Sequence, residues 1–450
     1  MSNTISIRKG LNIRLVGEST KEIKDIPVSN TVCLSPLDFH GLIPKLVIKE
    51  GESVQVGDVI FHDKKNERIK FVSPTSGKIK QIVRAEKRKI VQILIESDSK
   101  QTCKKFDVKK VADTSKEEVL DLLLNSGIWP SIKQRPLDIV ADPSNEPKGI
   151  FISSFDSSPL APDYSFILKG KMDQVQIGLN ALNQLASGKI HLSSRKNSDF
   201  TKMQNVIHHH VDGIHPAGNI GTQIHHINPV NKGEFAWSIN IQDVAAIGQL
   251  FETGCLDGKK CIAVGGSEIK HPAYYNIHSG SLLSDILKDN VVGENVRYIS
   301  GNVLTGDQKS ANGYIGFYHN QITVIPEGNE YKFFLTKGWL GLGFDKFSNS
   351  RLFPTFLLPK SKRFTLDTNT NGEERAFVVT GELEKVFPFD ILPMHLTKAA
   401  ITEDIDGMEN LGIYEVAPED FALCEYVCTT KINIQEKIRH GLDLIASECM

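Results

Sequence analysis

The side chains with the clearest chemical potential in this 450-residue chain are six closely spaced histidines, His208, His209, His210, His215, His225 and His226. Neutral imidazole is a common ligand for zinc, copper and iron. However, the segment holds no cysteine, its carboxylates are Asp212 and Glu234, and its spacing matches no zinc signature. We therefore predict no metal site, with His215 and His225 as weak candidates. The alternative is a loop, punctuated by Gly and Pro, whose histidines form hydrogen bonds.

Seven cysteines form a second set of reactive side chains: Cys33, Cys103, Cys255, Cys261, Cys424, Cys428 and Cys449. They are scattered, odd in number and free of any C-x-x-C pair, a pattern typical of reduced thiols in a cytosolic protein. We expect neither a disulfide framework nor a four-cysteine metal or cluster site. Cys424 and Cys428 would share one helix face, which favours buried thiols. An iron–sulfur cluster shared with a partner protein is the alternative.

The N-terminal part of the chain is predicted to be a small all-β unit. From Pro44 to Ile95, short β-branched runs alternate with Gly and Pro turn signals. The order of these turns resembles barrel-sandwich domains of the lipoyl and biotinyl carrier type. In those carriers a modified lysine sits at the tip of one hairpin, whereas Asn66 or Glu67 occupies that position here. An unmodified structural domain is therefore favoured over a swinging-arm carrier.

The next part of the chain follows an α/β pattern. Ser115 and Glu118 form a capping box before an apolar helix that ends at Gly127. A buried strand at 150–152 precedes an amphipathic helix at 172–185, closed by Gly188, and a second strand at 190–192. Strands that alternate with helices indicate a Rossmann-like core. The part has no G-x-G-x-x-G motif, so dinucleotide binding is not supported.

Charge is uneven along the chain, although the net charge is only −2. Residues 1–115 carry 22 Lys and Arg against 14 Asp and Glu, which suits an anionic membrane surface, an acidic partner subunit or a solvated face. No motif of a known nucleic-acid-binding module is present, so nucleic acid is not an expected partner. No signal peptide and no run of ~18 apolar residues is seen. If the protein acts at a membrane, we therefore expect it to lie outside the bilayer.

The segment GIWPSIKQRP follows the helix that begins after Ser115. A helix followed by SGI resembles the start of the flavin-binding domain in the NADH-oxidising subunit of respiratory complex I and in the C component of Rnf electron-transport complexes. The resemblance implies a glycine-rich loop whose amides approach the flavin phosphate. Trp129, Pro130, Ile132 and Arg135 occupy that region here. Neither flavin nor NADH is therefore expected to bind at this point.

Four separated motifs resemble the A component of the sodium-translocating NADH:quinone oxidoreductases: HPAGNIGTQIHHINPV, SGNVLTG, YHNQITVIPEG and GWLG at 338–341. The resemblance covers nearly the whole chain. It implies a peripheral subunit on the cytoplasmic side of the bacterial inner membrane, whose partners are the other subunits of a complex that oxidises NADH, reduces ubiquinone and transports sodium. No flavin, iron–sulfur cluster or covalently bound cofactor is expected in this chain, so alone it is not expected to be catalytic.

Two roles within such a complex stay open. In the first, the chain takes part in quinone reduction, which requires an apolar cleft and one or two hydrogen-bond donors. Trp129 would stack on the quinone ring, and Lys133 or Arg135 would stabilise negative charge on a semiquinone. The alternative makes Trp129 a packing residue and Arg135 a surface charge. Tyr318 and His319 are either donors to a ligand carbonyl or local packing residues.

The second role is a non-catalytic scaffold, in this or an Rnf-type complex, that covers membrane subunits and holds no ligand. Residues 331–365, rich in Phe, Leu and Trp and interrupted by Gly and Pro, would form its docking surface, or would instead fill the core.

Overall, the sequence predicts a multidomain α+β protein. Residues 1–100 are expected to form a barrel-sandwich β domain with an added N-terminal strand, and 101–255 a Rossmann-like domain that resembles a flavin domain without its glycine loop. Residues 256–335 are expected to form a β-grasp domain, and 336–450 an aromatic-rich connection and a helical domain.

Overall fold

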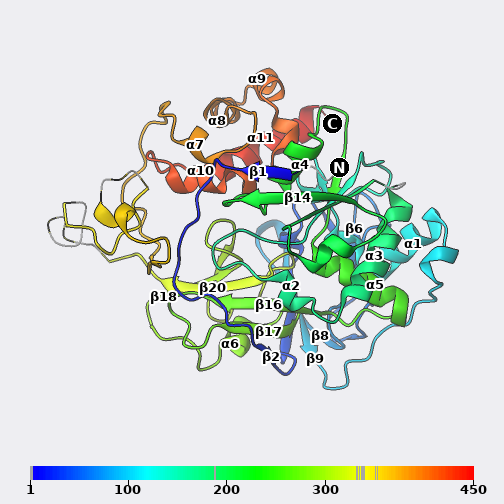
Figure 1. Cartoon of the computed structure of the whole chain (residues 1–450). Helices are drawn as coiled ribbons and strands as arrows, with labels where there is room; N and C mark the ends of the chain where they lie inside the picture. The colour runs from blue at the N-terminus through cyan, green and yellow to red at the C-terminus, as the bar shows by residue number, and fades with distance from the viewer. Residues whose placement is uncertain are drawn as a thin grey trace.

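The computed structural model describes residues 4–186, 189–330, 333, 335, 340–349, 351 and 353–449. In this part of the chain the strands form four sheets, and a group of C-terminal helices lies together at one end of the molecule (Figure 1). Gly188, and Gly338 and Trp339 of the GWLG motif, lie outside the described residues.

A barrel-sandwich of two small sheets forms most of the N-terminal part. One sheet contains β3 (Thr31–Leu34), β9 (Ile90–Ser97), β8 (Gly77–Arg84) and β5 (Ser53–Val54), and the other β4 (Pro44–Leu46), β6 (Val59–Asp63) and β7 (Lys70–Val72). Ile60, Phe61 and Ile93 are fully buried between them. Next to the β6–β7 turn, Arg68 pairs with Asp121 and Lys70 donates to Asn125, both on α1 (Lys116–Ser126). This hairpin is therefore anchored on a neighbouring helix.

A seven-stranded sheet forms the centre of the molecule. Its order is β1 (Thr4–Ile7), β14 (Ile207–Gly213), β13 (Ile190–Ser194), β12 (Ile150–Ser153), β15 (Ala236–Ser238), β10 (Lys133–Arg135) and β11 (Ile139–Val140). The first five strands are parallel, β10 is antiparallel to β15, and β11 is antiparallel to β10. The strand predictions at 150–152 and 190–192 are confirmed, and the apolar residues of both segments are buried within a mainly parallel sheet.

The helices of this layer also follow the sequence pattern. The Ser115–Glu118 capping box is formed at the start of α1, and Gly127 ends that helix in a left-handed conformation. The predicted helix at 172–185 is α3 (Met172–Leu185), which packs closely against α5 (Ile241–Thr253). A Cβ at Gly178 or Gly248 would overlap a backbone carbonyl of the opposite helix, so these glycines permit the close approach.

The expected addition of an N-terminal strand to the barrel is not what the structure shows. β1 instead pairs in parallel with β14 of the central sheet, and β2 (Ile23–Asp25) pairs in parallel with β17 (Ala273–His278). Short strands carry little information about their partners, since pairing is decided by contacts far apart in the sequence. The N-terminal segment thus runs along two other sheets before the barrel begins (Figure 1).

The strands between residues 259 and 326 belong to a six-stranded sheet. Its order is β19 (Asp307–Lys309), β18 (Val296–Ser300), β20 (Gln321–Pro326), β16 (Lys259–Gly265), β17 and β2. The short helix α6 (Leu283–Ile286) packs with this sheet through a core that includes Ile262, Leu283 and Val324.

The C-terminal helices share one core, which also includes Ile13, Leu15 and Leu137 from earlier parts of the chain. The helices are α7 (Leu383–Val386), α8 (Pro393–Ile401), α9 (Ile405–Asn410), α10 (Ala422–Val427) and α11 (Ile434–Glu448), with the 3₁₀ turn η8 (Pro418–Phe421) between α9 and α10. Cys424 and Cys428 are buried with free thiols, which confirms that part of the cysteine prediction. Among the described residues, no helix is long and apolar enough to cross a membrane.

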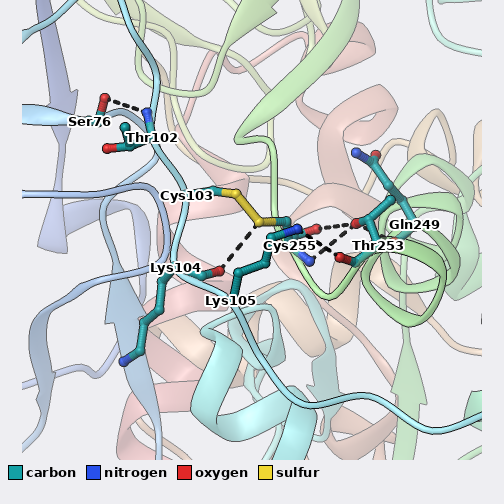
Figure 2. Close-up of a disulfide and its surroundings, with 8 residues drawn as sticks. All are labelled: Ser76, Thr102, Cys103, Lys104, Lys105, Gln249, Thr253 and Cys255. Carbon is teal, nitrogen blue, oxygen red and sulfur yellow. Dashed lines mark hydrogen bonds between the residues drawn. A yellow bond between two sulfur atoms is a disulfide. The ribbon is translucent and has the colours of Figure 1, made fainter.

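The prediction that all cysteines are reduced is wrong for one pair. Cys103 and Cys255 form a disulfide that joins the segment after the barrel to the end of α5, with Cα atoms 6.2 Å apart (Figure 2). The Thr102 amide donates to Ser76 in the barrel, and Lys105 donates to the Thr253 carbonyl. The two cysteines are 152 residues apart, so their spacing could not reveal the pairing.

Candidate functional site

A cavity of about 220 Å³ lies beside the central sheet. Ser153 and Ser238 reach it from the carboxyl ends of β12 and β15, and Asn219 reaches it from the start of α4 (Ile220–Ile227). In open α/β sheets, ligands bind outside the carboxyl ends of the parallel strands. The C-terminal helical region closes the other side through Glu419 of η8. Asn302 and Tyr318, from the connections of the six-stranded sheet, also line the cavity, which therefore lies where three parts of the fold meet.

Lys133 is the quinone-binding candidate that lines the cavity. Its ammonium group pairs with Asp138 at 3.1 Å and lies 4.6 Å from the centroid of the Tyr318 ring. These contacts orient the side chain, while 30% of its surface stays accessible. The Tyr318 hydroxyl donates to the Pro130 carbonyl at 2.7 Å, so its hydrogen is already used. Lys133 therefore supplies a positioned cation to the cavity.

Arg135 lies behind the cavity wall instead of on the surface. Its side chain is 2% exposed, and its Nη1 donates to Asp420 at 2.6 Å and to the Glu415 carbonyl at 2.8 Å. Burial acts to lower the pKa of Arg135, but the carboxylates of Asp420 and Glu419 raise it above its ordinary value. A Cβ at Gly221 of α4 would overlap the Asp420 carboxylate. This ion pair therefore holds the C-terminal region against the central sheet.

Trp129 is also buried, and it does not reach the cavity lining. Its indole nitrogen donates to the Ala141 carbonyl at 2.7 Å, and its ring packs edge-to-face on Trp237, with centroids 5.3 Å apart. Because the indole nitrogen is hydrogen-bonded and the whole side chain is buried, Trp129 has no free ring surface on which a ligand ring could stack. The geometry thus corresponds to the packing role that the sequence left as an alternative.

Glu419 brings an acid into the same cavity. Glu419 lines the cavity, and 38% of its side-chain surface is accessible. Burial and the adjacent Asp420 raise its pKa to about 7, against the opposing effect of Arg135 and Lys133. Asp243, at another wall, has its pKa raised by burial to about 6. The cavity therefore combines a cation with two carboxyl groups, Glu419 and Asp243, whose pKa values are raised.

The two histidine candidates make hydrogen bonds with protein groups. His215 lines the cavity with its Nδ1 3.0 Å from the Ser157 hydroxyl, and burial lowers its pKa to about 4. His225 accepts the Asp390 amide at Nε2, so its Nδ1 donates to Glu415 at 2.7 Å. No group of three or more His, Cys, Asp or Glu side chains could hold a metal ion within the described ranges. His319, similarly, lies 2.8 Å from the Ser300 hydroxyl.

Sequence reasoning placed Lys133 in the site but missed Glu419, Asp138 and Asp243. Arg135 and Glu419 are 284 residues apart, and only the fold brings them together. The acidic character of the segment around Glu419 was visible in the sequence, but acidic runs usually form solvated surface. A site with one cation, a protonatable acid and hydroxyl and amide groups is suited to a small ligand with acceptor oxygens.

Comparison with known proteins assigns most of the chain. Residues 5–98 match the model of the NqrA N-terminal barrel-sandwich hybrid domain, and residues 114–256 match the NqrA second alpha/beta domain. Residues 261–311 match a model described as the NQRA C-terminal domain.

Full-length relatives give the same result. The A subunit of the Na(+)-translocating NADH-quinone reductase of Neisseria meningitidis is 38% identical over 99% of this chain and 100% of its own length. The corresponding proteins from Haemophilus influenzae and a Marinomonas species are 37% and 35% identical, and each alignment covers at least 98% of both chains. An NAD+-reducing nickel–iron hydrogenase overlaps 49% of this chain with a TM-score of 0.33, a likeness too weak to establish a shared fold.

Proposed function

Because this chain belongs to the NqrA family, the A subunits of the Na(+)-translocating NADH-quinone reductases, we propose that its cavity binds the head group of ubiquinone. The chain is one subunit of a translocase complex, and the other subunits are its partners. A site on the cytoplasmic side of the bacterial inner membrane accords with this role. The central and six-stranded sheets would then be the Rossmann-like and β-grasp units of the protein.

The observation that carries this proposal is the position of Lys133. Lys133 lines a cavity at the carboxyl ends of parallel strands, together with Ser153 and Ser238. A quinone carbonyl accepts hydrogen bonds, and a cation beside it stabilises negative charge that develops on its oxygen. Since an ammonium group has three donors, its contacts with Asp138 leave capacity for a ligand. Binding would therefore position the quinone, while electrons come from the rest of the complex.

Changing Lys133 to Met is expected to weaken the binding of a soluble short-chain ubiquinone by roughly 10- to 100-fold. Removing a charge-assisted hydrogen bond costs about 1.5–3 kcal/mol, and the Met side chain keeps most of the volume. Titration of the purified chain, followed by tryptophan fluorescence, measures the effect, because Trp237 precedes the cavity residue Ser238.

The matched control is Lys45 to Met, an exposed lysine on the barrel whose ammonium pairs with Glu67. The ubiquinone affinity of the Lys45 variant should equal that of the unchanged chain. Equal affinities for the Lys133 and Lys45 variants would contradict a quinone site at this cavity.

A second role, docking on the membrane subunits, is favoured by exposed apolar side chains in the segment after β20 (Gln321–Pro326). Leu342, Phe344 and Leu357 are 75%, 62% and 74% exposed. Large apolar groups gathered on one exposed segment mark interaction surfaces. They correspond to the docking surface that the sequence suggested for residues 331–365.

Changing Leu342 and Leu357 together to Asp is expected to abolish co-purification of this chain with the membrane subunits, because two carboxylates would have to be buried without partners. The control is Val292 to Asp, because the Val292 side chain is also exposed, at 61%, but lies in the connection between α6 and β18. This variant should co-purify with the membrane subunits as the unchanged chain does. The stoichiometry of the purified complex measures the outcome. A double variant that assembles at the normal ratio would rule out docking through this segment.

A further inference from the structure

We propose that Glu419, in its protonated form, donates a hydrogen bond to a carbonyl oxygen of the ligand in the cavity. The site would then bind an uncharged carbonyl compound together with one proton on this side chain. This inference rests on the proposed quinone site, and it adds a specificity-determining residue to that site.

The geometry around Arg135 separates Glu419 from its neighbour. Asp420 accepts a hydrogen bond from Nη1 of Arg135 at 2.6 Å and another from the backbone amide of Ala417 at 2.8 Å. Glu419 receives only Nη2 of the same guanidinium group, at the longer distance of 3.4 Å. One buried guanidinium group therefore serves two adjacent carboxyl groups unequally. The less strongly bound carboxyl, Glu419, is the one that faces the cavity.

The charges around Glu419 favour its protonation. Four charged groups change the pKa of Glu419: Asp420 on its own element, and Lys133, Arg135 and Asp138 on the segment that begins at β10. Arg439 of α11 forms an ion pair with Asp138. The other titratable groups that line the cavity are Asp156, Asp243 and His215. Burial and the nearby carboxylates raise the pKa of Glu419 to about 7, whereas His215, whose pKa is about 4, is neutral at this pH. Burial and the neighbouring carboxylates therefore both favour the protonated form of Glu419.

The two forms of Glu419 interact with a carbonyl ligand in opposite ways. A carboxylic acid donates one hydrogen bond, whereas a carboxylate is acceptor-only and repels a carbonyl oxygen. Lys133, at another position on the same cavity, remains a donor in either case. Binding of the ligand should therefore draw a proton onto Glu419, and affinity should be full at low pH and lost as pH rises through about 7.

The test is a titration of the full chain with a soluble short-chain ubiquinone between pH 6.5 and 8.5, followed by tryptophan fluorescence. The dissociation constant of the unchanged chain is expected to rise roughly 20-fold across this range. Glu419→Gln, which keeps an N–H donor but cannot ionise, is expected to retain the low-pH affinity at every pH. Glu419→Ala, which has no donor, is expected to bind more weakly and with no dependence on pH.

Glu67→Gln is the matched control, because it makes the same chemical change at a side chain that is 66% exposed on the barrel and does not line the cavity. It is expected to keep the pH dependence of the unchanged chain. Thermal unfolding of each variant checks that it is folded. Proton uptake on mixing with the quinone at pH 7, followed with an indicator dye, should occur in the unchanged chain and be absent in Glu419→Gln.

The outcomes separate this inference from the quinone site itself. Saturable binding whose affinity is independent of pH, or a Glu419→Gln variant that keeps the full pH dependence, would overturn the role of Glu419 and leave the quinone site intact. No saturable binding at any pH would overturn both proposals.

Discussion

Replacing Arg135 with alanine is expected to lower the free energy of unfolding by about 3–5 kcal/mol, because the change leaves Asp420 as a buried, uncompensated charge. Arg135 is 2% exposed, the Asp420 side chain is fully buried, and their atoms are 2.6 Å apart. The pair also joins the central sheet to the C-terminal helical region. Detachment of that region should therefore accompany the loss of stability.

Denaturant unfolding, followed by far-UV circular dichroism, measures this loss. Lys45→Ala, which removes an exposed pair with Glu67, should cost less than about 1 kcal/mol. Replacing Arg135 by Met and Asp420 by Leu together should recover part of the stability, since no lone charge stays buried. A single Arg135 variant as stable as the Lys45 variant would contradict the structural role of this pair.

Replacing Trp129 with alanine is expected to cost about 3–5 kcal/mol of stability, because a large and fully buried side chain leaves a cavity. Trp129→Phe should cost less, about 1–3 kcal/mol, because it fills most of the space but leaves the Ala141 carbonyl without its donor. Both losses are measured by denaturant unfolding, followed by circular dichroism because the changes remove a fluorophore.

Phe356→Ala is the control for this series, since Phe356 is 44% exposed and its truncation should change stability by no more than about 0.5 kcal/mol. In the Trp129→Phe variant, quinone affinity should be close to that of the unchanged chain. A large loss of affinity at unchanged stability would instead favour the stacking role that the sequence first suggested for Trp129.

Lys133 is a better position than Arg135 or Trp129 for testing ligand binding. Arg135 and Trp129 support the wall of the cavity, so replacing either of them with alanine would weaken binding through loss of structure alone. Lys133 is partly accessible and lines the cavity, and after its replacement Asp138 keeps an ion pair with Arg439, at 3.5 Å.

Elements whose signals are local could be predicted from the sequence. The capping box at Ser115, the helix at 172–185 and the buried strand at 150–152 lie in the structure where their patterns indicated. Helix caps and apolar periodicity act over a few residues, so a single sequence carries them completely. Family membership was also available from the sequence, because its motifs are contiguous runs of residues.

Features that depend on distant neighbours required the folded chain. Folding pairs β1 with the central sheet, joins Cys103 to Cys255, and buries Arg135 against Asp420. It also brings Glu419 into the cavity that Lys133 enters. Burial, ion pairing and the proton affinity of a side chain are properties of its surroundings in space. The residue types offered the chemistry, and long-range packing selected which of them face a ligand.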